Sequence, residues 1–243
     1  MPHDWDAASY DRLPIPMTGW GLAVLKLLPL RGDERVLDAG CGTGHVTAAL
    51  RDRLPEGDVI ALDASASMLE RARDRLGDDR VAYLRHDLLE PIPIDPVDAI
   101  LSTATFHWVP DHDLLFANLA AVLNPGGHLT AQCGGAGNIA TVEAAARELG
   151  RDVAEDKVFA TPEDTTKRLE RAGFVDIVCA LVTAPTRIPI EDLELYLATV
   201  CMGGILDRTP EKDRAALVSG VAGRMAEPVI DYVRLNISAR RAP

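Results

Sequence analysis

The sequence predicts an α/β fold in which a seven-stranded, mostly parallel sheet carries helices on both faces. From Arg35 to Cys133, short β-branched or apolar runs alternate with longer stretches rich in Ala, Leu and Arg, which is the pattern of consecutive βαβ units. The length of 243 residues fits one such domain with an added helical lid, because single cores commonly stop growing at about 250 to 300 residues.

The first half of the chain is expected to supply five strands and the helices that connect them. The strands are expected at 35–39, 58–62, 81–85, 97–102 and 127–133, and helices at 20–30, 44–53, 65–76 and 112–122. Ser65 can cap the helix that follows it by accepting a backbone N–H. Right-handed crossovers place the loops that follow the strands at one edge of the sheet.

The second half is expected to complete the sheet and to add the lid. The run GGAG at 134–137 predicts a flexible stretch. Thr161 with Asp164 resembles a capping box at the start of a helix over 162–172. The remaining strands are expected at 174–182 and 229–239, with a polar helix through about residue 150 and helical segments at 190–202 and 210–226. We interpret these last two segments, together with residues 1–20, as the lid.

A glycine-rich turn follows the first strand in the run VLDAGCGTG at 36–44. Glycines at positions 40, 42 and 44 allow a ligand to approach the backbone closely and tolerate turn conformations that other residues resist. Asp63 closes the second strand nineteen residues beyond Gly44, and a carboxylate at about that distance can accept both hydroxyls of a ribose. The third glycine of a dinucleotide fingerprint would fall at His45, so the pattern predicts a nucleoside cofactor of another kind.

Four segments, in the expected order, resemble the class I S-adenosylmethionine-dependent methyltransferases. They are VLDAGCGTG at 36–44, VIALDASASML at 59–69, Asp87 after the third strand, and LNPGGHL at 123–129. The string LSTATFHWVPDH at 101–112 is similar to the trans-aconitate methyltransferase group of small-molecule enzymes. The resemblance covers roughly residues 30–180 and implies a Rossmann-like sheet whose last strand is antiparallel, with S-adenosylmethionine as cofactor and S-adenosylhomocysteine as product.

The resemblance also implies a single methyltransferase domain over residues 1–243. Its expected parts are an N-terminal helical cap (1–30), a cofactor-binding core (31–183), a helical lid insertion (184–228), and a final strand and tail (229–243).

Cofactor contacts are carried over from the resemblance to ten positions. Asp63 is expected to bind the ribose, Asp87 and the backbone at Leu88 the adenine, and Asp38 the methionine amino group, directly or through water. The full set is Tyr10, Asp38, Gly40, Gly42, Gly44, Asp63, Met68, Asp87, Leu88 and Ser102. Structural alternatives stay open: a helix cap for Asp63, a surface acid for Asp87, stabilisation of the glycine turn for Asp38, and ordinary packing for Met68 and Tyr10.

His107 and Trp108 follow the fourth strand, where the methyl group would point towards the acceptor, and they are the catalytic candidates. Histidine titrates near neutrality and can take a proton from a hydroxyl or an amine. A carboxylate acceptor needs no base, in which case His107 only orients it or is hydrogen-bonded for structure. Trp108 either forms a wall of the acceptor pocket or packs beneath it.

The acceptor is expected to be a small molecule, with a carboxylate or hydroxyl oxygen favoured and a secondary metabolite as a further candidate. A tricarboxylate such as trans-aconitate should be held by clustered Arg or Lys. Between Pro185 and Asn236, however, six Arg and Lys residues face eight Asp and Glu residues. Trans-aconitate is therefore one candidate among several.

Composition argues against other classes of partner. The net charge of -12 disfavours nucleic acid and anionic membrane, and four scattered cysteines predict neither a metal site nor disulfides, as expected of a cytoplasmic protein. Two rivals remain: a nicotinamide oxidoreductase, which the displaced glycine disfavours, and a protein that binds S-adenosylmethionine but has lost methyl transfer and serves as a sensor, partner subunit or cofactor-assisted cyclase. The oligomeric state is left open.

Overall fold

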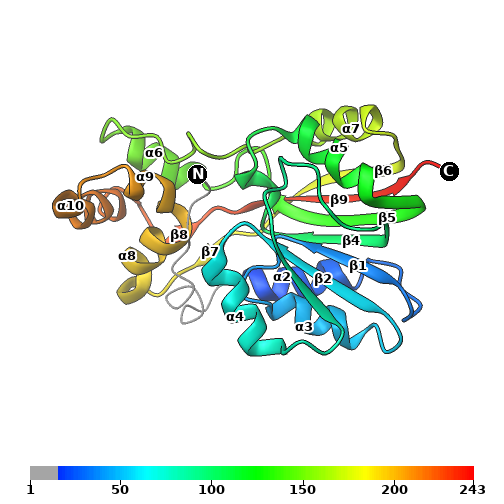
Figure 1. The fold of residues 1–243 in the computed structure, drawn as a ribbon. Helices are drawn as coiled ribbons and strands as arrows, with labels where there is room; N and C mark the ends of the chain where they lie inside the picture. The colour runs from blue at the N-terminus through cyan, green and yellow to red at the C-terminus, as the bar shows by residue number, and fades with distance from the viewer. Residues whose placement is uncertain (1–15) are drawn as a thin grey trace.

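A computed structural model describes residues 16–243 of the chain (Figure 1). Tyr10 and the first half of the expected N-terminal cap, residues 1–15, lie outside the described residues. None of the helices within 16–243 has the length and apolar character needed to cross a membrane.

The seven-stranded sheet has the order β3-β2-β1-β4-β5-β9-β6. Its strands are β1 (Arg35–Ala39), β2 (Asp58–Asp63), β3 (Val81–Arg85), β4 (Val97–Thr103), β5 (Leu123–Gly134), β6 (Phe174–Thr183) and β9 (Val233–Arg241). The first five run parallel, whereas β9 lies antiparallel between β5 and β6. The expected mostly parallel sheet with an antiparallel last strand is therefore confirmed.

Helices cover both faces of the sheet (Figure 1). On one face lie α2 (Met17–Leu25), α3 (His45–Asp52) and α4 (Ala66–Leu76), and on the other lie α5 (His112–Val122) and α7 (Pro162–Arg171). The interior strand β1 is buried by both layers, with Val36, Leu37 and Ala39 inaccessible to solvent. A strand buried on both faces explains the continuous apolar run in the sequence.

Two helix starts follow the expected capping chemistry. Ser65 Oγ accepts the Met68 N–H at 3.3 Å, which caps α4. Thr161 Oγ1 accepts the Asp164 N–H at 3.1 Å, and Pro162 occupies the first position of α7. Both side chains satisfy N–H groups that have no partner within the helix.

A separate group of helices lies beyond the carboxyl ends of the parallel strands, on the left in Figure 1. It contains α6 (Ala140–Arg147), α8 (Leu193–Tyr196), α9 (Gly203–Asp207), α10 (Glu211–Ala222), the short turns η2 (Ile190–Asp192) and η3 (Leu197–Cys201), and the ribbon of β7 (Thr186–Arg187) with β8 (Val229–Ile230). These elements share an apolar core of their own, inside which the hydroxyls of Tyr196 and Tyr232 are 2.7 Å apart. Whether this group moves as a lid stays a prediction.

The structure corrects the expected strand at 229–239, which divides into β8 and β9. Asp231 leaves the ladder because its carboxylate accepts the Thr141 N–H at 3.0 and 3.2 Å and its carbonyl accepts the Ile139 N–H. Asp231 thereby supplies the cap that the start of α6 lacks in its own sequence.

The glycine run 134–137 also differs from expectation, since it is held in place by hydrogen bonds. Gly135 forms a bridge with Ala160 and donates its N–H to Val233 O at 3.0 Å. A Cβ at Gly135 would lie 2.9 Å from Leu235 Cβ. The glycine is present for close backbone packing rather than for flexibility.

Removing the cap of α7 is expected to destabilise the fold. Thr161→Ala should lower the free energy of unfolding by about 1 kcal/mol, because the Asp164 N–H loses its acceptor. Thr161→Ser keeps an acceptor at the same place and should lose less than half of that amount. Urea unfolding of the three proteins is the measurement, and equal stability of wild type and Thr161→Ala would contradict the assigned cap.

Candidate functional site

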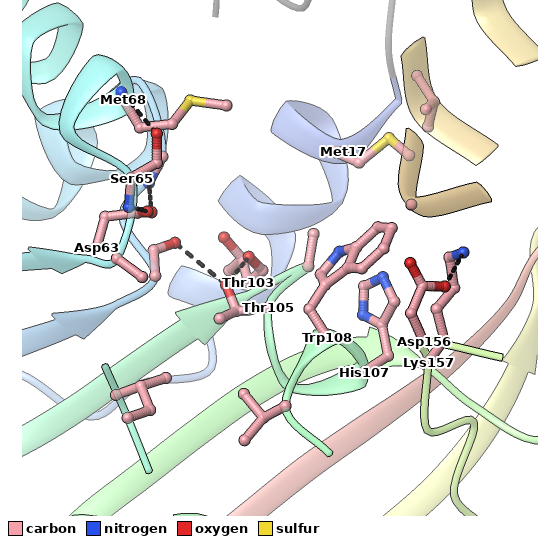
Figure 2. Close-up of a pocket in the computed structure, with 18 of the residues that line it drawn as sticks. Met17, Asp63, Ser65, Met68, Thr103, Thr105, His107, Trp108, Asp156 and Lys157 are labelled. Atoms are coloured by element: carbon pink, nitrogen blue, oxygen red, sulfur yellow. Dashed lines mark hydrogen bonds and ion pairs between the residues drawn. The ribbon is translucent and has the colours of Figure 1, made fainter. Parts of the chain in front are cut away.

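A cavity of about 770 Å³ opens at the carboxyl ends of β1, β2 and β4. Figure 2 shows Asp63, Ser65 and Met68 on one side of it, His107, Trp108, Asp156 and Lys157 on the other, and Thr103 and Thr105 between them. The two halves come from different parts of the chain, and each has its own chemistry.

The glycine turn forms the floor of the first half, and its three glycines have three different roles. At Gly40 a side chain would collide with Thr105, while the space that a Cβ would occupy at Gly42 is open. Gly44 packs α3 onto α4, since a Cβ there would lie 3.1 Å from Ala72 Cβ. All three have a positive φ, which L side chains rarely adopt. Of these three glycines, Gly40 and Gly42 line the cavity and Gly44 does not.

Asp63 joins the glycine turn to the start of α4. Its Oδ2 accepts the Gly42 N–H and its Oδ1 accepts the Ser65 N–H, both at 2.9 Å. Burial raises the pKa of this carboxyl, and the hydrogen bonds from Ser65 and Gly42 oppose that rise. Each oxygen keeps a lone pair, so the carboxylate can accept two further hydrogen bonds from the cavity side.

The wall beside Asp63 is mostly apolar. Met68 and Leu88 are buried, and both line the cavity together with Asp87. Met68 lies on α4, and the loop that carries Asp87 and Leu88 is fixed at two points: Asp87 Oδ1 accepts the Leu89 N–H at 3.0 Å, and Asn118 donates to Leu88 O at 2.9 Å. An apolar wall with a carboxylate beside it suits a heteroaromatic ring bearing an amino group.

His107 and Trp108 lie in the turn η1 (Phe106–Trp108), which follows β4. The imidazole stacks on Phe159 with centroids 5.9 Å apart and planes 24° apart, and the Trp108 ring lies 5.1 Å away. The Gly134 N–H donates to His107 Nδ1 at 3.3 Å. The segment 155–159 crosses beside them, tied by the Val158 N–H to His107 O at 2.8 Å.

Two buried cations face this half of the cavity. The side chain of Lys157 is 2% exposed; its ammonium lies 3.0 Å from Asp156 Oδ1 and 4.7 Å from the centre of the Trp108 ring. Arg234, on β9, is 3% exposed and stacks over Trp20 at 5.0 Å. Both line the cavity.

Comparison with known proteins assigns the family. A model described as a methyltransferase domain matches residues 36–127. A trans-aconitate 2-methyltransferase of Variovorax paradoxus (strain S110) is 31% identical over 242 residues, which cover 97% of this chain and 85% of that protein. One of Acidovorax sp. (strain JS42) is 26% identical over 99% of this chain and 100% of its own length. The chain belongs to the class I S-adenosylmethionine-dependent methyltransferases.

Within these methyltransferases the chain falls in the trans-aconitate group, and solved structures agree on the fold. Phosphoethanolamine N-methyltransferase 2 of Haemonchus contortus, in complex with phosphomonomethylethanolamine and S-adenosylhomocysteine, superposes with a TM-score of 0.65 at 22% identity, over 93% of this chain and 53% of that one. A methyltransferase-like protein of Bacillus halodurans gives 0.64 at 21% identity, over 92% and 99%.

The methyltransferase cavity gathers most of the residues that the sequence singles out. The lining includes Gly40, Gly42, Asp63, Met68, Asp87, Leu88, His107 and Trp108. Three others lie behind the cavity wall: Gly44 packs two helices together, Ser102 donates to Ala39 O at 2.6 Å between β4 and β1, and Asp38 accepts from Thr47 Oγ1 at 2.7 Å. Tyr10 lies outside the described residues.

Sequence reasoning missed the two buried cations of the methyltransferase cavity. Lys157 lies in a segment with no periodic pattern, and the charge count between Pro185 and Asn236 did not include it. Arg234 was counted as one of six bases, although its burial distinguishes it from the surface residues around it. The signal available in the sequence was an Arg inside a strand of alternating apolar residues.

Asp38 has an unusual environment behind the glycine turn. Burial raises the pKa of its carboxyl to about 7, the charge of Asp63 adds to that rise, and the Thr47 hydroxyl opposes it. Its Oδ1 is buried with no hydrogen-bond partner among residues 16–243. The folded protein therefore holds this proton up to near neutral pH, whereas an unfolded Asp releases it near pH 4.

The higher pKa of Asp38 in the folded state makes the stability of the protein depend on pH, and the direction of that dependence can be worked out. Between pH 4 and 7 the folded state binds more protons than the unfolded state, so the Asp38 contribution to the unfolding free energy falls as pH rises, by about 1 kcal/mol per pH unit. Asp38→Asn should remove that slope, because the amide does not titrate and its oxygen still accepts from Thr47. Urea unfolding of both proteins without cofactor at pH 5, 6, 7 and 8 tests this, and parallel stability curves would show that Asp38 ionises normally.

Proposed function

We propose that this methyltransferase esterifies a small-molecule carboxylic acid, transferring the methyl group of S-adenosylmethionine to a carboxylate oxygen. The observation that carries the proposal is the positive potential around His107. Its pKa is held well below the usual range, first by burial and then by the charges of Arg234, Lys157 and His112. A desolvated site with this potential attracts an anionic acceptor and disfavours a protonated amine.

The first half of the cavity fits the cofactor in shape and in polarity. The open space at Gly42 allows a ligand to lie against the backbone. We infer that Asp63 accepts the ribose hydroxyls, and that Asp87, the Leu88 backbone and Met68 bind the adenine. The unpartnered Oδ1 of Asp38 is an acceptor for the methionine amino group, through a water or by a small shift of the turn.

When bound, the cofactor supplies a methyl group on a positively charged sulfur, which the acceptor oxygen displaces in line. The contribution of the chain is to align the acceptor and to exclude water. Trp108 and Phe159 form apolar walls next to His107. Val200, Cys201 and Tyr232, which belong to the apolar core of the helical group, line this end of the cavity. Moving an anion from water into an apolar cavity costs desolvation free energy. The acid therefore binds here only if the cations offset that cost.

The carboxylate proposal includes trans-aconitate, the substrate in the names of the relatives. The charge count between Pro185 and Asn236 argues less strongly against it once the positions are known. Of the eight acids in that segment only Asp207 lines the cavity, and all eight fall within the described residues. Arg208, Arg234 and Lys157 line the cavity as well.

Removing the charge of Asp63 should weaken cofactor binding. Asp63→Asn should raise the Kd for S-adenosylhomocysteine roughly tenfold to 100-fold, because two charge-assisted hydrogen bonds become weaker ones. Isothermal titration calorimetry gives the affinity. Asp58→Asn, at the exposed start of the same strand, is the matched control and should bind like wild type. Unchanged affinity in Asp63→Asn would remove Asp63 from the cofactor site.

A panel of acceptors tests the reaction itself. With radiolabelled S-adenosylmethionine, we expect methyl transfer to trans-aconitate or to simpler polycarboxylates, none to primary amines, and release of the label as methanol in mild base, since esters hydrolyse and ethers do not. Arg234→Gln should lower kcat/KM for the acid at least tenfold, and Arg240→Gln, a surface residue on the same strand, should not. Cofactor binding without transfer to any acceptor would favour the alternative of a protein that has lost methyl transfer.

A further inference from the structure

We infer that His107 acts as a hydrogen-bond donor that orients the acceptor oxygen, and that it is not the base that deprotonates the acceptor. This inference rests on the proposed function for the identity of the acceptor, but the state of the His107 ring is a property of the protein alone. It follows from the partner of Nδ1, from the packing of the ring, and from the charges around it.

The backbone of β5 fixes which ring nitrogen carries the proton. The Gly134 N–H points at Nδ1, with a nitrogen-to-nitrogen distance of 3.3 Å. A nitrogen that accepts a hydrogen bond presents a lone pair, so the proton of the neutral ring is on Nε2. In the described part of the chain Nε2 has no hydrogen-bond partner, and His107 lines the cavity. Nε2 is therefore available to donate to a ligand.

Packing holds the ring in this orientation. Phe159 stacks on it with centroids 5.9 Å apart, and the Trp108 ring lies 5.1 Å from it. Gly134 itself cannot carry a side chain, since a Cβ there would lie 2.8 Å from Phe159 Cε1. The glycine thus lets Phe159 come close enough to stack on the imidazole while its own N–H reaches Nδ1.

The charges that act most strongly on this ring are cationic. Arg234 faces it from β9, and Lys157 faces it from the segment 155–159, where it pairs with Asp156. His112, on α5, repels a second proton only when it is itself protonated, and burial lowers the pKa of its ring. Cys133, on β5, adds no opposing charge, because burial raises the pKa of its thiol to about 12. A ring buried among cations is a poor proton acceptor, because an imidazolium there would be repelled.

The acceptor must therefore arrive with no proton to lose. In the transfer step a carboxylate oxygen forms the new bond to the methyl carbon, the carbon-sulfur bond breaks, and its electron pair stays on sulfur. The positive charge on sulfur and the negative charge on the carboxylate disappear together, and no proton moves. Alcohols and protonated amines would need a base at this place, so the geometry restricts the acceptors to acids that are ionised at neutral pH.

Nitrogen-15 NMR of histidine-labelled protein tests the ring without any acceptor. The chain has six histidines, and the spectrum of His107→Gln identifies the signals of His107. We expect the Nε2–H tautomer, unchanged between pH 5.5 and 8.5. A proton on Nδ1, or a titration midpoint between pH 6 and 8, would overturn the inference even if the protein methylates carboxylates.

Kinetics with the best carboxylate acceptor provide the second test. His107→Gln keeps an N–H donor and should retain at least one third of kcat/KM, while His107→Leu should lose roughly tenfold to 100-fold, as expected for a hydrogen bond to a charged group. The wild-type kcat/KM should be flat from pH 6 to 8.5. His128→Gln, on β5 but outside the cavity lining, is the control and should match wild type. A histidine-like rise in the pH profile that His107→Gln abolishes would show that His107 is a base.

Discussion

The half of the cavity that we assign to the cofactor depends on one carboxylate, that of Asp63. Its two oxygens take the N–H groups of Gly42 and Ser65, which belong to the turns after β1 and β2. These bonds hold the two turns at a fixed separation and also orient the carboxylate towards the cavity. The desolvation cost of burying it is offset by donors that the backbone supplies in a fixed geometry.

The acceptor half depends on contacts between segments that are far apart in the sequence. Strand pairing sets Gly134 of β5 opposite Arg234 of β9. The Gly134 N–H fixes the tautomer of His107 and the Arg234 charge opposes its protonation, so both effects depend on the register of this one pair of strands. A slip of β9 by one residue would move Arg234 to the other face of the sheet. Strand β9 therefore helps to build the acceptor site, although it is the last strand of the chain.

The sequence predicted those parts of the fold that local patterns determine. The strands at 35–39 and 81–85, the caps at Ser65 and Thr161 and the cavity position of Asp63 follow from periodicity, side-chain chemistry and motif spacing, and all are found. The direction of a side chain near the end of a strand was not predictable from the motifs, which is why the positions of Asp38 and Ser102 behind the cavity wall were not foreseen. The break at Asp231 and the inward position of Lys157 depend on tertiary contacts with α6 and Trp108 that no local pattern encodes.

The placement of charge in the cavity suits the proposed reaction. Asp63 and Asp87 line the half assigned to the cofactor, with Asp38 behind its wall, and Lys157 and Arg234 line the half assigned to the acid. Of the other acids in the lining, Asp156 pairs with Lys157 and Glu155 pairs with Arg208. On this assignment each half attracts the charge of its own ligand and keeps the wrong ligand out. Transfer cancels both charges at once, so the ester loses its attraction to the cations and the second product loses the charge on its sulfur. The same arrangement that assembles an anion and a cation in a dry cavity thus weakens the binding of both products when the reaction is complete.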